Sequence, residues 1–258
     1  MKKLYIAIIA AVAAMAALPA AAQERFDNNQ WSIHFGTLQT PTPTFLDHRN
    51  PAMAISINDY STAFPWGVTM RFEHEKVVSD LFGYGFALSA GVRHTGWNYT
   101  IPKGTPYVDN TYLGPTDADC NMYTSLLGFT VDGGAYAALH PTNWFQVYAT
   151  VGVAVSRWWE GSGSKLIYNG YELQGACGAA DDGIAGTLLG TFAQVGMKFT
   201  FNEDFFFSLS ARLVEGFNRE GAMSGTLDFN APFYSCGVNA PFSSEWMLLA
   251  GIGVMIEE

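Results

Sequence analysis

Ionisable residues recur in stretches that otherwise alternate between large apolar and small side chains. In one of them, Gly83–Trp97, Arg93 follows an apolar run. One parity of this run is large and apolar, and the other is mostly Gly, Ala and Ser. Charges that leave water must pair, because an unpaired buried charge is strongly destabilising. We predict one paired network on the small parity: Arg71, Glu73, Arg93, Asp132, Gln194, Lys198 and Arg212. It would act as a structural plug or line a narrow conducting path; the plug is favoured because it needs no further assumption.

Histidine placement bears on enzymatic chemistry. A nucleophile needs a base within hydrogen-bond reach and a third group that orients the base. Of the five histidines, His94 is the one that combines a place near a predicted strand end with serine and acidic residues in nearby connections. This placement resembles a lipid-modifying dyad, but a histidine there is more often an interfacial polar residue. The sequence therefore favours a protein that is not an enzyme and has no cofactor.

The three cysteines, Cys120, Cys177 and Cys236, fall in three different long connections. An exported chain permits disulfides, and three pairings are open, each leaving one thiol over. A bridge between two connections would brace them, although three unpaired cysteines are an equal alternative. We expect no metal site, because no two cysteines are close in sequence and no histidine adjoins them.

The first residues have the pattern of a cleaved export signal. Lys2 and Lys3 precede an apolar run from Leu4 to Leu18, which small residues follow up to Ala22. We predict a signal peptide over residues 1–22 and a single domain over residues 23–258. The run is too short to favour an uncleaved membrane anchor.

Charge and composition narrow the class of protein. Without Lys2 and Lys3, 11 basic residues face 23 acidic ones, a net charge of −12, which argues against nucleic-acid binding. Charged residues make up 14% of the chain, against about 25% in typical soluble domains. The most apolar later segment, from Ile184 to Phe201, alternates and contains Gln194 and Lys198, so we do not expect a spanning helix there.

Eight segments share the alternation that is typical of strands. They are Trp31–Gln39, Trp66–Glu75, Tyr84–Tyr99, Tyr123–Leu139, Phe145–Trp159, Leu188–Phe201, Asp204–Phe217 and Trp246–Ile256. The connections between them are long and short in strict alternation, as in an up-and-down barrel with short periplasmic turns and long external loops. Because a membrane leaves no water for an open sheet edge, the sequence predicts a closed eight-stranded antiparallel β-barrel.

Parity assigns the two faces of this barrel. The large apolar parity is expected to face lipid and the small parity, with nearly all strand charges, to face the lumen. An arginine facing lipid at mid-membrane would cost about 2–4 kcal/mol, and the cost falls towards zero near the interfaces. The exceptions, Arg157, Glu215 and His94, fall near the predicted external rim.

Tryptophan placement is a further, independent indication. All seven tryptophans lie at ends of predicted strands, where interfacial belts of aromatic residues are expected. We therefore predict an aromatic girdle of Trp31, Trp66, Trp97, Trp144, Trp158, Trp159 and Trp246. The alternative is that these residues only pack in a core.

With this layout, the chain from Trp31 to Glu258 resembles small outer-membrane β-barrel proteins of the OmpA, OmpX and OmpW type, and especially the short barrels of Bacteroidetes-like genomes. The resemblance implies a bacterial outer-membrane location, contact with membrane lipid and lipopolysaccharide, and insertion by the barrel-assembly machinery. Members commonly end on an aromatic residue, whereas this chain ends Ile256, Glu257, Glu258. The chain carries no catalytic motif, so the resemblance assigns no functional residue to it.

We expect a structural or surface-interaction role, with a narrow side-chain-filled lumen and long external connections available to an extracellular ligand. Three alternatives stay open. The first is a small channel for passive diffusion of small or hydrophobic solutes, and the second is an enzyme that modifies lipid A. The third is a soluble lipocalin-like barrel, whose apolar face would point inward around a ligand.

Overall fold

The computed structural model describes part of the chain. Its backbone is described for residues 29–39, 47–50, 55–56, 60–79, 81–101, 118–142, 144–161, 165–168, 171–173, 185–202, 204–217, 223–228, 235–240 and 244–256. The predicted signal peptide lies outside the described residues. Within them, no helix has the length and apolar character needed to cross a membrane.

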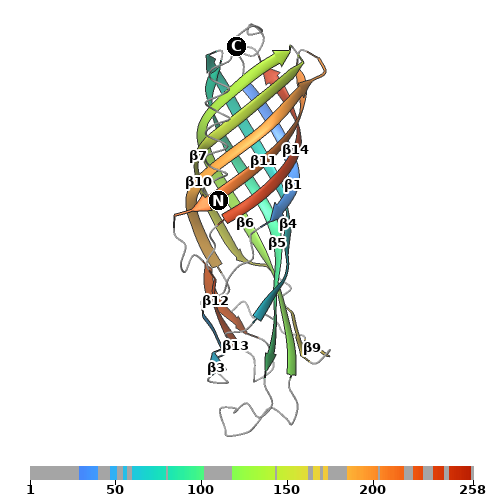
Figure 1. The fold of residues 1–258 in the computed structure, drawn as a ribbon, viewed down its shortest axis with the longest axis vertical. Helices are drawn as coiled ribbons and strands as arrows, with labels where there is room; N and C mark the ends of the chain where they lie inside the picture. Colours follow the sequence, from blue (N-terminus) through green and yellow to red (C-terminus); the bar gives the residue numbers. More distant parts are fainter. Residues whose placement is uncertain are drawn as a thin grey trace.

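Eight long antiparallel strands form a closed barrel (Figure 1). They are β1 (Asn29–Gln39), β4 (Tyr60–Ser79), β5 (Phe82–Ile101), β6 (Ala118–Thr142), β7 (Phe145–Glu160), β10 (Ala185–Thr200), β11 (Phe205–Gly216) and β14 (Ser244–Ile256). Each strand pairs with the next in this order. The last, β14, pairs with β1 from Asn29↔Ile256 to Gln39↔Trp246, so the sheet has no open edge around the barrel. The predicted eight-stranded barrel is confirmed.

Short connections join strands at one end of the barrel, which we call the turn end. Ser79 pairs with Phe82 across the first hairpin and Thr142 with Phe145 across the second. In the third, the Asn202 side-chain oxygen accepts hydrogen bonds from the backbone N–H of Asp204 (3.1 Å) and of Phe205 (2.8 Å). Asparagine commonly fixes tight turns in this way. The opposite end, with the long connections, is the loop end; in outer-membrane barrels it faces outward.

Several barrel strands continue past the membrane at the loop end. Strands β4 and β5 have 20 residues each and β6 has 25, whereas about 9–11 residues cross a bilayer. Short strands pair onto these extensions or onto one another: β2 (Asp47–Asn50), β3 (Ile55–Ser56), β8 (Lys165–Tyr168), β9 (Tyr171–Leu173), β12 (Met223–Asp228) and β13 (Ser235–Ala240). In Figure 1, β3, β12 and β13 lie below the barrel on the left, and β9 lies below it on the right. These segments fall in predicted connections, because strands this short have no alternation of their own.

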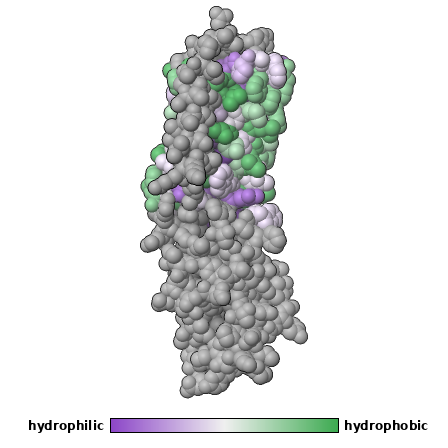
Figure 2. All heavy atoms as spheres, in the orientation of Figure 1, coloured by the Kyte–Doolittle hydropathy of each residue, from purple (hydrophilic) through white to green (hydrophobic). Residues whose placement is uncertain are grey.

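The barrel wall is apolar on its exterior. The exposed large side chains include Phe35, Val68, Met70, Phe72, Leu88, Val131, Val153, Leu248 and Ile252. Green, apolar residues dominate the coloured barrel surface in Figure 2. The other parity is buried inside, as along β14, where exposed and buried residues alternate. This is the reverse of a lipocalin-like barrel, so the soluble alternative is wrong.

Aromatic side chains gather at both ends of this exterior. At the turn end, Trp31 lies 4.1 Å from the ring of His74 and 5.3 Å from that of Phe72. Trp144 contacts Phe145 at the same end. At the loop end lie Trp66, Trp159 and Trp246, of which Trp159 packs on Phe129 at 5.5 Å. Trp97 is on β5, and its side chain lies outside the described residues.

Candidate functional site: the polar lumen and the outer rim

Side chains fill the described part of the lumen. The largest of those that are fully buried are Trp158, Arg71, Arg212, Tyr136, Tyr148, Phe192 and Phe206. Between the aromatic rings, charged and amide groups form three layers. We describe these layers from the loop end to the turn end as the outer, middle and inner layers.

The outer layer consists of Trp158, Arg93 and Glu245. The Trp158 Nε1–H donates a hydrogen bond to Glu245 Oε1 at 2.8 Å. The Arg93 guanidinium carbon lies 5.0 Å from the centre of the Trp158 ring, a cation–π contact that keeps this buried charge beside an electron-rich face. All three side chains are buried.

The prediction that Trp158 belongs to the aromatic girdle is therefore wrong. Even-numbered residues of β7 point into the lumen, and Trp158 is only 2% exposed. Its partner across the β6–β7 ladder is Gly128. A Cβ atom at Gly128 would overlap the Trp158 ring, so the glycine provides the space that the indole occupies.

The middle layer is centred on Asp132, whose carboxylate binds two arginines. Arg71 donates from Nη1 to Oδ2 at 2.6 Å and from Nη2 to Oδ1 at 2.9 Å. Arg212 donates from Nη2 to Oδ2 at 2.8 Å, and its guanidinium carbon lies 3.9 Å from the Phe192 ring centre. Both arginines are 1% exposed. One carboxylate thus joins β4, β6 and β11 across the lumen.

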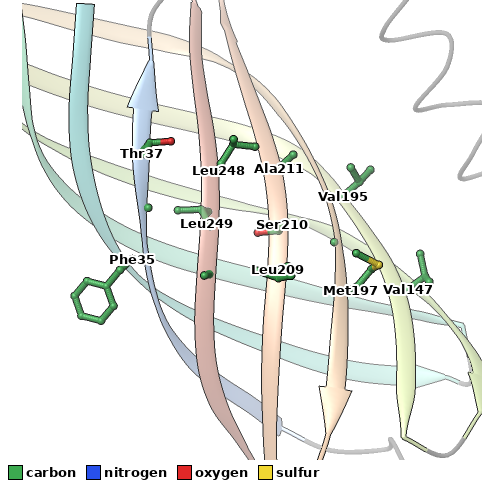
Figure 3. A pocket seen from close by; sticks show the side chains of 13 residues that line it. Phe35, Thr37, Val147, Val195, Met197, Leu209, Ser210, Ala211, Leu248 and Leu249 are labelled. Atoms are coloured by element: carbon green, nitrogen blue, oxygen red, sulfur yellow. The ribbon is translucent and has the colours of Figure 1, made fainter.

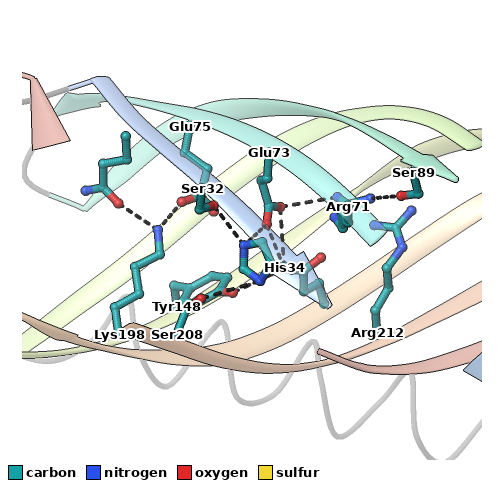
Figure 4. A network of polar contacts seen from close by, with 12 residues as sticks. Ser32, His34, Arg71, Glu73, Glu75, Ser89, Tyr148, Lys198, Ser208 and Arg212 are labelled. Atoms are coloured by element: carbon teal, nitrogen blue, oxygen red, sulfur yellow. Dashed lines mark hydrogen bonds and ion pairs between the residues drawn. The ribbon is translucent and has the colours of Figure 1, made fainter. Parts of the chain in front are cut away.

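Glu73 connects the middle and inner layers. Its Oε1 accepts a hydrogen bond from Arg71 at 3.2 Å, and its Oε2 lies 3.2 Å from His34 Nε2 and 3.3 Å from Gln194 Nε2. Gln194 also donates to the Tyr148 hydroxyl at 3.2 Å. Figure 4 shows His34 between Glu73 on one side and Ser208 on the other. The lumen is therefore cross-linked from β1 and β4 to β7 and β10.

Two serines and a glutamate surround His34, so the residue types of a catalytic triad meet inside the lumen. Ser32 Oγ (2.8 Å) and Glu73 Oε2 (3.2 Å) both contact the same ring nitrogen, Nε2. A triad places the nucleophile and the orienting acid on opposite nitrogens. Ser208 Oγ does lie on the opposite nitrogen, Nδ1, at 3.4 Å, but Ser208, His34 and Glu73 are all buried in the lumen, where a substrate has no access to the serine. The group therefore acts as a structural cross-link.

The inner layer surrounds the Lys198 ammonium. It forms an ion pair with Glu75 and donates a hydrogen bond to Gln30 Oε1 at 2.6 Å. Its nitrogen also lies 4.6 Å from the ring centre of Tyr148 and 5.0 Å from that of Phe206. Lys198 is thus both paired and enclosed by aromatic rings near the turn end.

All seven residues of the predicted network lie buried in the lumen and belong to these layers: Arg71, Glu73, Arg93, Asp132, Gln194, Lys198 and Arg212. Three further buried residues of this lumen, His34, Glu75 and Glu245, lie outside the network predicted from the sequence. The parity of β4 predicts Glu75 to point inward. Glu245 precedes the predicted last strand, Trp246–Ile256, whereas β14 of the structure begins at Ser244.

At the loop end, the exterior wall holds two hydrogen-bonded polar pairs. Ser125 Oγ and His94 Nδ1 are 2.8 Å apart, and the His94 ring lies 4.8 Å from that of Trp66. Arg157 Nη1 donates to Thr187 Oγ1 at 2.8 Å. His94 and Arg157 are both exposed on the lipid-facing parity, as the sequence analysis expected of rim residues.

An apolar groove runs along the exterior between β1, β14, β11, β10 and β7 (Figure 3). Short residues such as Ala211 and Ala250 lie between longer ones such as Phe35, Met197 and Leu248. Because the groove is on the outer face of the wall, membrane hydrocarbon covers it. It is therefore separate from the lumen and gives no entry to it.

The predicted disulfide lies outside the described side chains. Cys120 falls on β6 and Cys236 on β13, each within a strand and not in a connection as expected, and Cys177 is outside the described residues. Their pairing stays a prediction. Across the residues whose positions are described, no group of three potential metal ligands comes together.

The fold and the lumen define a small outer-membrane β-barrel: strand pairing closes the sheet, apolar side chains cover it, and ion pairs fill it. The sequence matches the family described as "Outer membrane protein beta-barrel domain" over residues 8–242, so the chain belongs to this family. Barrels of this class lie in bacterial outer membranes, which places the chain among membrane lipid. No curated protein matches the sequence.

Two solved structures are reported as similar to this chain. The outer membrane protein OprG from Pseudomonas aeruginosa matches with a TM-score of 0.56 and 14% identity, covering 92% of this chain and 100% of that one. A major outer membrane protein from Thermus thermophilus matches with a TM-score of 0.43 and 11% identity, over 88% and 99% of the two chains. At these identities the likeness to OprG concerns the fold alone.

Proposed function

We propose that this protein is a non-conducting barrel that anchors its extracellular strands and connections in the outer membrane, in a structural or surface-interaction role. The observation that carries the proposal is the middle layer, in which Asp132 binds Arg71 and Arg212 across the lumen. Aromatic rings pack against the charges on both sides of this layer. An eight-stranded barrel has an interior only wide enough for its own side chains.

A conducting path would require this network to open. Separating a buried charge from its partner costs about 3–5 kcal/mol, and the Asp132 carboxylate has two such partners. The middle and inner layers are also connected through Glu73, so a change in one of them disturbs the other. These contacts support a plug over the alternative of a small channel for passive diffusion.

Planar-bilayer recording of the purified full chain tests this proposal. We expect no discrete conductance steps from the wild type. The triple variant Arg71→Ser, Asp132→Ser, Arg212→Ser, which empties the middle layer, should show measurable steps if it still folds. Steps of similar size from the wild type would contradict the plug and favour the channel.

We further propose that the barrel is not an enzyme. Ser125 and His94 form a hydrogen bond at the rim, but among the described residues no carboxylate is bonded to His94 to orient it. Without a third group, a serine and a histidine lack the arrangement that activates a nucleophile. Lipid A from cells producing the wild type and Ser125→Ala should therefore have the same acyl chains by mass spectrometry. A difference between the two would favour the alternative of a lipid A-modifying enzyme.

The extended strands β4, β5 and β6 support the surface role, because they carry backbone well past the membrane at the loop end. An extracellular ligand would contact this end. The barrel-assembly machinery remains the expected partner for insertion. Neither partner is needed for the plug itself.

A further inference from the structure

Arg157 is a cation on the lipid-facing wall. Along β7, the outward positions are Val151, Val153, Val155, Arg157 and Trp159. The three valines are exposed apolar side chains, and Arg157 follows them immediately. The apolar band of β7 therefore ends at a guanidinium group. From this position we propose that Arg157, with Thr187, binds the phosphate group of an outer-leaflet lipid.

The level of Arg157 in the membrane supports this proposal. Strand β7 begins at the turn end at Phe145, 12 residues before Arg157. At about 3.3 Å per residue and a tilt of about 40°, this length spans about 30 Å, the thickness of the hydrocarbon core. Trp159, two residues further on, packs on Phe129 at 5.5 Å as interfacial aromatic residues do. Arg157 thus lies where lipid headgroups carry their phosphates.

The guanidinium is held in place but keeps most of its donors. A hydrogen bond of 2.8 Å to Thr187 Oγ1 on the adjacent strand β10 fixes one Nη1–H. On the other side, Arg157 pairs across the ladder with Phe129, an exposed ring on β6. An arginine has five N–H donors, and its planar fork matches two phosphate oxygens. The side chain can therefore bind a phosphate without losing its contact with Thr187.

Charge complementarity favours an anion here. Among the described residues, no carboxylate forms a hydrogen bond or ion pair with Arg157, whereas the lumen arginines Arg71 and Arg212 share Asp132. Because the outer leaflet of this membrane consists of phosphorylated glycolipid, the ligand that fits is the phosphate of lipopolysaccharide. This inference does not depend on whether the lumen conducts.

Native mass spectrometry of the folded, detergent-solubilised barrel tests the proposal with purified lipopolysaccharide as the probe. We expect Arg157→Gln to retain lipopolysaccharide about five-fold less than the wild type, as for the loss of one partly exposed charge-assisted contact. Arg157→Lys keeps the charge but loses the fork, so its retention should fall in between. Lys76→Gln is the matched control, because it removes one exterior cation at the turn end.

Two further measurements distinguish the phosphate of the lipid from free inorganic phosphate. Enzymatically dephosphorylated lipopolysaccharide should bind wild type and Arg157→Gln equally, and inorganic phosphate at the same concentration should not displace the intact lipid. Equal retention of intact lipopolysaccharide by wild type and Arg157→Gln, in folded protein, would overturn the proposal. So would an equal loss in Lys76→Gln, since it would indicate a general effect of charge. Displacement by inorganic phosphate would show that the site lacks the lipid selectivity proposed.

Discussion

Replacement of Asp132 by asparagine tests the middle layer most sharply. The substitution keeps the size of the side chain but removes the charge that Arg71 and Arg212 share at 2.6–2.9 Å. Two buried guanidinium groups would then face each other, with Glu73 as the nearest bonded acid of Arg71. Because breaking a buried pair costs about 3–5 kcal/mol, we expect the free energy of unfolding to fall by at least that amount.

The assay is equilibrium unfolding in urea of the barrel refolded into neutral lipid vesicles. The folded fraction is read on gels from the folded band, which shifts when the sample is heated. Arg157→Gln is the control, because its side chain is an exposed cation at the rim, and a surface change of this kind alters stability by less than about 0.5 kcal/mol. Adding Arg212→Met to Asp132→Asn should recover part of the loss, since one of the two stranded cations is then removed.

A decrease below about 1 kcal/mol for Asp132→Asn would refute the reasoning, because it would be much smaller than the cost of breaking a buried ion pair. Strict additivity of Asp132→Asn and Arg212→Met would also refute it, since residues that share a hydrogen-bonded charge pair are expected to be coupled.

Two further predictions use the same unfolding assay. Lys198→Met leaves the Glu75 carboxylate without its ion-pair partner in the inner layer and should lower the free energy of unfolding by about 3–5 kcal/mol. Adding Glu75→Gln should restore part of this loss. No recovery in the double variant would argue against their pairing. Gly196→Val inserts methyl groups where a Cβ would already overlap the Tyr148 ring and should cost about 1–3 kcal/mol, whereas an unchanged midpoint would mean that Tyr148 packs elsewhere.

Which side chains face lipid and which face the lumen could be predicted from the sequence, because side chains of a strand point in only two directions. Once the apolar parity of β5 was assigned to lipid, the same rule turned Arg93, Asp132 and Lys198 inward, where the structure places them. The eight alternating segments then predicted the number of strands, and the lack of water in a membrane predicted the closure of the sheet. The parity of a segment and its length are both local in sequence, so they can be read from one chain.

Trp158 shows where that reasoning failed. Its position at a strand end suggested the girdle, although its parity on β7 already pointed inward. The space for its ring is created by Gly128 on the neighbouring strand, and its hydrogen-bond partner Glu245 is 87 residues away. Such complementarity depends on the register between strands, which no pattern within one strand encodes.

The partners within the lumen were unpredictable for the same reason. Parity gives the set of inward residues, but the choice of Asp132 as the shared acceptor of Arg71 and Arg212 depends on the stagger of β4, β6 and β11 around the barrel. The short strands at the loop end were not predicted, because their own sequences have no strand pattern. They are stabilised by pairing with β6, with β10 and with each other.

The most direct test of the central claim is the environment of Trp158 inside the barrel. Full-length protein labelled with 5-fluorotryptophan in lipid nanodiscs gives fluorine resonances that Trp158→Phe and Trp246→Phe variants assign. We predict that a nitroxide lipid broadens the Trp246 signal, and that neither this lipid nor a water-soluble gadolinium chelate broadens the Trp158 signal. Broadening of Trp158 by the chelate would show a lumen open to water, and broadening by the nitroxide lipid would place Trp158 on the exterior; either result would contradict the account.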